Sequence, residues 1–505
     1  MSDGRMKNSA RNIVSGIINK AVSMLFPFII RTVIIKEIGI EYAGLNGLFS
    51  SILAVLSISE LGFGSAIVYS MYKPVAEHDD DKVCALLNLY RKVYRYVGGI
   101  ILLLGLALLP FLRWFVKGDV PNDINLHFLY LVFLFNTVIS YFTFAYKSSI
   151  LTATQREDLN TKVNTYVNIG GYICQLIVLI LTRYYMAYIF LLPVFTIVIN
   201  IVRSCVVDRY YPQYKCKGQI EKDELKSIYK NVGALVGNRI NGTIILSADS
   251  IVISAILGLT ASACYNNYYY IINAVIGFVI IIFNSVRPSI GNSMVTESRE
   301  KNYSDFKKIS SMICWIAGFC SISLICLFQP FMTLWVGEEY LLPFSTVVMF
   351  GLYFYEWKML DVLVLYRDAG GMWWSDRFRP YIVSLVNIAG NISLVHFFGL
   401  NGVVFATLFS SMCISYPWVL CILFKEYFKT TCWEYLKELF FNTVIVAVSG
   451  VITYLACNLI PIDGFIALGI KIGVCCVLPN IIIYITFGKN TILFTLLKGK
   501  LLKKH

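Results

Sequence analysis

The chain has 505 residues, of which 57% are hydrophobic and only 14% charged, and its mean hydropathy is +0.68. A soluble domain carries about 25% charged residues, so this chain lacks the polar surface that a protein surrounded by water requires. The formal net charge of +13 suggests nucleic-acid binding at first, but the positive residues are distributed along the chain as in a membrane protein.

Apolar segments long enough to form membrane-spanning helices, about 20 residues each, follow one another along the whole chain. They cover residues 12–36, 44–70, 86–112, 126–151, 162–182, 187–207, 230–257, 262–289, 306–328, 344–366, 379–397, 402–423, 436–459 and 465–488. The first is too long for the apolar part of a cleaved signal, so we expect it to be a span. The short alternating segments of a membrane β-barrel are not seen. The pattern predicts an all-α polytopic membrane protein of about fourteen transmembrane helices.

The connectors between these segments alternate in charge. Nearly all Lys and Arg residues fall in one set of connectors, which includes residues 208–227 and the tail 498–504, and the other set holds few. Because positive residues remain on the cytoplasmic side, both termini are expected to be cytoplasmic. We therefore expect a multi-pass protein of the bacterial cytoplasmic (inner) membrane, with connectors too short to house a folded catalytic domain.

A faint internal repeat relates the two halves of the chain. Residues 11–12 match residues 230–231, and residues 19–20 match residues 238–239 at the same offset. One repeat contains an even number of spans, so the copies point the same way, as in parallel repeats with a cavity between two lobes. The predicted parts are a six-helix N-lobe over 1–210, a six-helix C-lobe over 211–425 and two C-terminal helices over 426–505.

Polar residues form a stripe on the first segment and a second stripe on its repeat-related partner, the seventh. At the helical period each set falls within about 120° of arc. The sets are Asn12, Gly16, Asn19, Lys20, Ser23, Pro27 and Arg31 on the first segment, and Asn231, Asn238, Arg239, Gly242 and Asp249 on the seventh. Such stripes on corresponding helices are what a central transport cavity requires.

Three cations, Lys20, Arg239 and Lys358, are predicted to lie at one depth, about 13 Å inside the cytoplasmic boundary. An ionisable residue in the membrane costs about 2.5–3.5 kcal/mol on insertion scales and usually faces a bundle interior or a watery cavity. The three cations predict a site for an anion, for which a diphosphate is a good candidate. The remaining predicted substrate-binding residues are Arg31, Asn19 and Asn238.

Carboxylates on neighbouring segments give these cations an alternative, structural role. Glu60 would neutralise Lys20, and Asp361, one helical turn from Lys358, would pair with it. Arg31 and Lys471 would extend toward the outer face. At this stage both roles stay open. Carboxylates inside the bundle are also candidates for coupling transport to a proton or sodium gradient, and these are Glu60, Asp249, Asp361 and Glu356.

Two other features of the sequence are interpreted as structural. The fourteen cysteines are scattered, mostly within apolar segments and without Cys-x-x-Cys pairs, so we expect small hydrophobic residues and no disulfide, metal or cofactor. The tyrosine-rich run at residues 265–270 is interpreted as an aromatic belt at the membrane interface, with stacking on sugars as the alternative.

Several stretches together resemble one family. They are residues 58–67 with 71–74, residues 248–254 with 265–269, and residues 366–371 with 376–380, 387 and 398–403. This combination is similar to that of bacterial lipid-linked oligosaccharide flippases, in the superfamily that also contains multidrug exporters and the lipid II flippase. The resemblance implies two six-helix lobes around a cavity, two extra C-terminal helices, and outward movement of undecaprenyl-diphosphate-linked sugars by alternating access.

The sequence and the resemblance together predict a flippase that carries a polyprenyl-diphosphate oligosaccharide to the outer leaflet without chemical change. Membrane lipids and polysaccharide polymerase machinery are the expected partners, and nucleic acid is not. One alternative is a cation-coupled drug exporter, although its cationic substrates would prefer an acidic cavity. The other is a membrane-embedded polysaccharide polymerase or ligase, although such enzymes commonly use a large outer loop, which this sequence lacks.

Overall fold

The computed structural model describes residues 2–60, 63–118 and 120–487. The side chains of residues 2–10, 13, 14, 59 and 60, and most of those from 222 to 246, lie outside this description. The described residues form helices and connectors and contain no β-strand, so the prediction of an all-α protein is confirmed.

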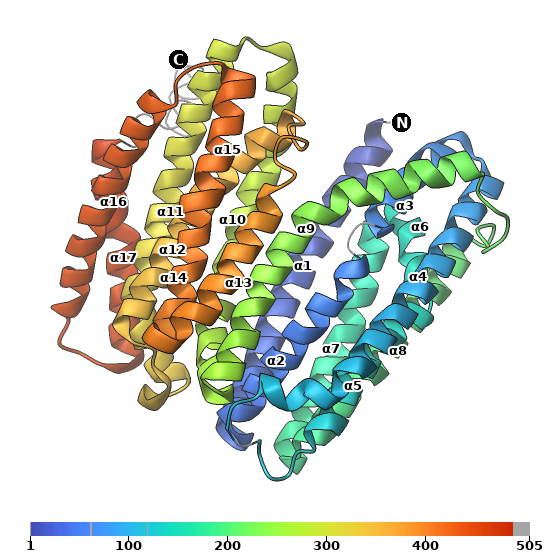
Figure 1. The fold of residues 1–505 in the computed structure, drawn as a ribbon, viewed down its shortest axis with the longest axis horizontal. Helices are drawn as coiled ribbons and strands as arrows, with labels where there is room; N and C mark the ends of the chain where they lie inside the picture. Colours follow the sequence, from blue (N-terminus) through green and yellow to red (C-terminus); the bar gives the residue numbers. More distant parts are fainter. Residues whose placement is uncertain (1, 61–62, 119, 488–505) are drawn as a thin grey trace. The chain divides into compact units, whose positions relative to one another are not determined.

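The chain divides into two compact units, Met1–Ala263 and Cys264–His505. The boundary falls within α10 (Figure 1). The helices up to that point are α1 (Ser2–Val33), η1 (Ile34–Ile38), α2 (Ile40–Leu56), η2 (Ser57–Glu60), α3 (Phe63–Glu77), α4 (Asp80–Leu108), η3 (Leu109–Phe115), α5 (Leu126–Phe142), η4 (Ala145–Lys147), α6 (Ser148–Ala153), α7 (Glu157–Thr182), α8 (Tyr185–Tyr210), α9 (Lys222–Ile256) and α10 (Leu259–Thr296).

The second unit contains most of α10 and all later helices. These are α11 (Arg299–Trp335), η5 (Glu338–Tyr340), α12 (Phe344–Ala369), α13 (Arg379–Phe398), α14 (Leu400–Ser410), η6 (Ser411–Ser415), α15 (Tyr416–Ile422), η7 (Leu423–Phe428), α16 (Trp433–Asn458) and α17 (Gly464–Thr486). Helix α11 packs against α12, α16 and α17, and α13 pairs with α14.

Local residue chemistry explains where several helices begin and end. The side chains of Asp79 and Asn125 accept hydrogen bonds from backbone N–H groups in the first turns of α4 and α5, which stabilises those helix starts. Gly258 and Gly399 have φ values of +102° and +56°, which favour glycine. They separate α9 from α10 and α13 from α14, so each permits a tight connection between consecutive helices.

In the first unit, α1 packs along α7, and α9 packs along α2 and α3 (Figure 1). Helices α5 and α6 meet at a 50° bend, where Phe144 adopts a left-handed conformation. The predicted span at 44–70 is likewise divided between α2 and α3, with η2 following α2.

The described residues form ten helices that are long and apolar enough to cross a membrane, or eleven with the bent α5–α6 pair. The protein is therefore a multi-pass membrane protein. Helix α12 does not meet the same criteria because each of its 18-residue windows contains Glu356, Lys358 and Asp361. The predicted total of fourteen spans, like the lobe boundaries at residues 210 and 425, stays a prediction.

Candidate functional site

The residues of the polar stripe predicted on the first segment lie in two different environments on α1, some in contact with α7 and others exposed. The Asn12 side chain accepts a hydrogen bond from the Asp158 backbone N–H at 2.7 Å, and the Asn19 side chain accepts one from the Thr165 hydroxyl at 3.1 Å. Both contacts join α1 to α7. Asn19, a predicted substrate ligand, therefore has a structural contact within the first unit.

Lys20 differs from its neighbour Asn19. It lies within the membrane-span candidate Ser15–Ile38, and its side chain is exposed in the structure. Among the residues whose side chains are described, no carboxylate forms an ion pair with it. The Glu60 side chain, the predicted alternative partner, lies outside the described residues. An exposed ammonium group inside a spanning segment is able to bind an anion.

Arg31 lies near the opposite end of α1 and is partly buried. Its guanidinium group donates a hydrogen bond to the Ala263 backbone carbonyl at 3.4 Å, which ties α1 to the start of α10. The structure thus separates the predicted ligands of α1, with Asn19 and Arg31 making protein contacts and Lys20 exposed.

On α9, the side chains of the predicted ligands Arg239 and Asn238 lie outside the described residues. Asp249, a coupling candidate on the same helix, is described. It is buried, with 2% of its surface exposed, and it interacts with other groups. A buried carboxylate that interacts with other groups is consistent with a structural role and also with an ion-binding role.

Lys358 and Asp361 form the predicted ion pair on α12. The Lys358 ammonium group lies 2.5 Å from a carboxylate oxygen of Asp361, and it also lies 4.6 Å from the centre of the Trp357 ring. Because the Lys358 side chain is only 3% exposed, its charge is compensated by the carboxylate and the ring. The expected structural pairing is confirmed, and a role of Lys358 in substrate binding stays a prediction.

Glu356 lies on α12, two residues before Lys358, and is buried with 9% exposed. The hydroxyl of Ser411 in η6 is its polar neighbour, and no cation is paired with the carboxylate within the described part of the chain. Next to it on α12, the Tyr355 hydroxyl contacts Thr443 at 2.7 Å and Cys314 at 3.1 Å. Since burial of an unpaired carboxylate is costly, Glu356 is the coupling candidate best placed to take up a proton or a cation.

A cluster of buried charges at the end of α12 was not predicted as a unit. Asp376 accepts hydrogen bonds from the guanidinium groups of Arg367 and Arg379, and Arg379 also donates to the Ser415 hydroxyl at 2.6 Å. These residues belong to the stretches that carry the family resemblance. The i,i+3 spacing of Asp376 and Arg379 was the available signal. The cluster joins the end of α12, the connector 370–378, the start of α13 and η6, and therefore stabilises the fold of the second unit.

The interpretation of residues 265–270 as an interfacial aromatic belt is wrong. Tyr265, Tyr268 and Tyr269 are buried within the second unit. The Tyr268 hydroxyl donates to the Gln329 side chain at 2.7 Å and accepts from the Leu342 N–H at 3.2 Å. Their buried positions do not suit stacking on sugars either, because ring faces packed on other side chains are covered.

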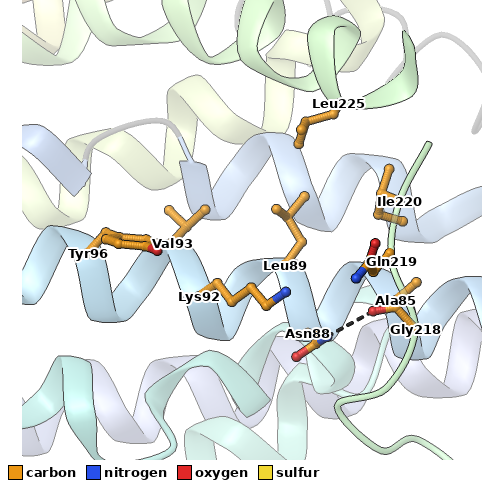
Figure 2. A pocket seen from close by; sticks show the side chains of 10 residues that line it. All are labelled: Ala85, Asn88, Leu89, Lys92, Val93, Tyr96, Gly218, Gln219, Ile220 and Leu225. Carbon is orange, nitrogen blue, oxygen red and sulfur yellow. Dashed lines mark hydrogen bonds between the residues drawn. The ribbon is translucent and has the colours of Figure 1, made fainter. Parts of the chain in front are cut away.

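A cavity of about 330 Å³ opens in the first unit between α4 and the connector that leads to α9 (Figure 2). Asn88 donates a hydrogen bond to the Gly218 carbonyl at its edge, at 2.9 Å, and Lys92 supplies the only charge among its lining residues. None of the predicted substrate or coupling residues lines this cavity.

A family model described as "Polysaccharide biosynthesis protein" matches residues 9–294, which is more than half of the chain. No curated protein matches the sequence. Among solved structures, lipid II flippase MurJ in an inward closed conformation is similar with a TM-score of 0.66 and 16% identity, over 96% of this chain and 99% of MurJ. An inward-facing MATE-family multidrug transporter of the MOP superfamily is similar with a TM-score of 0.63 and 13% identity, over 81% of this chain and 97% of that one.

The Vibrio cholerae MATE transporter VcmN gives a TM-score of 0.58 and 13% identity, over 84% of this chain and 99% of that one. At these identities the likeness concerns the fold, and the fold is one that MurJ and MATE transporters have. The family match covers enough of the sequence to decide membership. The chain belongs to the polysaccharide biosynthesis protein family.

Proposed function

We propose that this member of the polysaccharide biosynthesis protein family is a flippase. It moves a polyprenyl-diphosphate-linked oligosaccharide from the cytoplasmic to the outer leaflet of the inner membrane by alternating access, for the export of a cell-surface polysaccharide. The sugar lipid is carried unchanged, so the protein is a transporter and not an enzyme. The positive connectors support cytoplasmic termini.

The exposed cation Lys20 is the observation that carries this proposal. Its ammonium group lies in a candidate span, where insertion of a charge is costly, and no described carboxylate compensates it. A diphosphate supplies that counter-charge and contributes charge-assisted hydrogen bonds of about 1.5–3 kcal/mol. Arg239 is proposed as the second ligand because it occupies the position related to Lys20 by the internal repeat.

Coupling to an ion gradient is proposed to involve Glu356. Of the described candidates, Asp361 has Lys358 as an ion-pair partner, Asp249 interacts with other groups, and Glu356 has the Ser411 hydroxyl nearby but no cation paired with it. A proton or a sodium ion would compensate its buried charge. Alternate protonation or ion binding at this position would then bias the conformational equilibrium of the transporter.

The experiment that tests the substrate site compares Lys20→Ala with Lys36→Ala in reconstituted vesicles. Both residues are exposed lysines of the same candidate span, but Lys36 lies in η1, near its other end. Loss of one diphosphate contact lowers affinity roughly ten- to a hundredfold, so Lys20→Ala should bind and flip the lipid-diphosphate sugar poorly, whereas Lys36→Ala should resemble wild type. Equal activity of the two variants would exclude Lys20 as a ligand.

A structural role for Lys20 predicts a different outcome. If Glu60 is its partner, Lys20→Ala leaves that carboxylate uncompensated and lowers the yield and melting temperature of the protein. Adding Glu60→Gln would then restore both, together with transport. A ligand role predicts a folded Lys20→Ala protein whose transport is not restored by Glu60→Gln.

A further inference from the structure

Three buried cysteines from separate helices meet in the second unit. Cys326 comes from the second half of α11, Cys457 from the last turn of α16, and Cys475 from the middle of α17. They are 5%, 2% and 1% exposed, respectively. Their sulfur atoms all lie within 4.8 Å of one another, and those of Cys457 and Cys475 are 3.9 Å apart. Because these cysteines are far apart along the chain, no local sequence pattern predicts that they meet.

The spacing of the three sulfur atoms is suitable for coordinating one metal ion. A Zn–S bond is about 2.3 Å long, so sulfurs around a tetrahedral zinc ion lie about 3.8 Å apart. The Cys457–Cys475 separation of 3.9 Å is close to that value, and the third sulfur completes a triangular face. A disulfide requires a sulfur separation of about 2.05 Å and would join only two of the three residues.

The chemistry of the donors selects the class of ion. Three thiol groups, with no histidine or carboxylate in the same group among the described residues, form a soft ligand set that favours zinc and copper(I) over magnesium or calcium. Each thiol loses its proton to solvent when the ion binds, so three thiolates around a divalent ion leave one net negative charge, and around a monovalent ion they leave two. Burial in an apolar region penalises the larger net charge more strongly.

Lys471 favours the divalent ion further. It lies one helical turn before Cys475 on α17, so the two side chains lie on the same side of that helix, and Lys471 is half-buried. Its ammonium group would balance the single negative charge of a divalent tris-thiolate complex. Extension of Lys471 toward the outer face, the role expected from the sequence, does not require a position one turn from a buried thiol.

We propose that Cys326, Cys457 and Cys475 bind a thiophilic divalent cation, with Zn²⁺ as the candidate ion. With three protein ligands, the ion retains one further coordination position. The site ties α16 and α17 to α11, and therefore stabilises the packing of these helices within the second unit. This inference is independent of the proposed transport function, because it concerns residues outside the candidate substrate and coupling sites.

Metal binding is tested on the purified, reduced and chelator-treated full-length protein in detergent. Titration with Zn²⁺ should give one tightly bound equivalent, and Co²⁺ as a spectroscopic substitute should produce a sulfur-to-cobalt charge-transfer absorption. Cys475→Ser should lower the affinity at least tenfold and weaken that absorption, because only two thiolate ligands remain. Cys476→Ser is the matched control, because Cys476 is adjacent on α17 but exposed, and it should bind metal like the wild type.

A second measurement needs no variant and covers the case in which Cys475→Ser fails to fold. Zn²⁺ should protect Cys326, Cys457 and Cys475 of the wild-type protein from a membrane-permeant maleimide under partly denaturing conditions, as read by mass spectrometry of peptides. Absence of both the cobalt absorption and the protection would overturn the proposal. So would a disulfide between Cys457 and Cys475 in protein isolated without reductant, since those thiols would then be unable to bind the ion.

Discussion

The buried cluster around Asp376 predicts a large loss of stability from a single change of charge. Asp376 is 1% exposed and accepts hydrogen bonds from Arg367 and Arg379, which are 3% and 7% exposed. Asp376→Asn keeps the shape of the side chain but leaves the two guanidinium groups with one carboxylate fewer. Asp368, which accepts a hydrogen bond from Arg367 at 2.6 Å, is then the only carboxylate among the described residues that is still paired with either arginine.

Removing one partner from a buried ion pair typically costs about 3–5 kcal/mol, because the remaining charge stays buried without compensation. We expect Asp376→Asn to unfold at a temperature several degrees below wild type, measured in detergent with a thiol-reactive or intrinsic fluorescence readout. Asp223→Asn is the matched control. Asp223 forms an i,i+3 pair with Lys226 in which both side chains are more than 80% exposed, and exposed pairs contribute little.

A free energy of unfolding of Asp376→Asn within about 0.5 kcal/mol of wild type, the range usual for surface substitutions, would contradict a structural role of this carboxylate. That result would mean that the arginines are solvated or find other partners. A loss of transport with unchanged stability would also contradict the structural role and would assign Asp376 to the transport mechanism instead.

Three further predictions concern charge pairing, coupling and topology. Lys358→Ala should lower the melting temperature because it leaves the Asp361 carboxylate without its ion-pair partner. Adding Asp361→Asn should restore part of the melting temperature, and no restoration would contradict the pairing. Glu356→Gln should retain lipid binding but make transport independent of the proton or sodium gradient, and unchanged gradient dependence in flux assays would exclude this carboxylate. For topology, two single-cysteine proteins are compared in intact cells, one that keeps only Cys216 and one that carries only Glu338→Cys. A membrane-impermeant thiol reagent should label Glu338→Cys and leave Cys216 unlabelled, and the reverse pattern would contradict the proposed orientation.

Hydropathy predicted the helical architecture because the length and apolarity of a span are local properties of the sequence. Each predicted apolar segment overlaps a helix of the structure. The breaks were not predictable in the same way. The α5–α6 segment bends at Phe144, a single left-handed residue in an apolar stretch. Hydropathy averaged over many residues does not reveal a change in the conformation of one residue.

The candidate sites were only partly predictable because residues adjacent on one helix can contact different parts of the protein. Asn19 and Lys20 were placed on one polar stripe, yet α7 covers Asn19 and leaves Lys20 exposed. The Lys358–Asp361 pair was predictable from its spacing on one helix. The cluster of Cys326, Cys457 and Cys475 was not, since it depends on the relative register of α11, α16 and α17, which no local pattern encodes.

The measurement that tests the flippase proposal most directly follows a labelled polyprenyl-diphosphate oligosaccharide between the leaflets of vesicles that contain the purified protein. If the protein is a flippase, we expect protein-dependent movement of the lipid, its recovery with unchanged mass, and competition by excess unlabelled polyprenyl diphosphate. A lipid that stays in its original leaflet while the same vesicles transport cationic drugs would exclude this function, and so would a sugar lipid recovered with an altered mass.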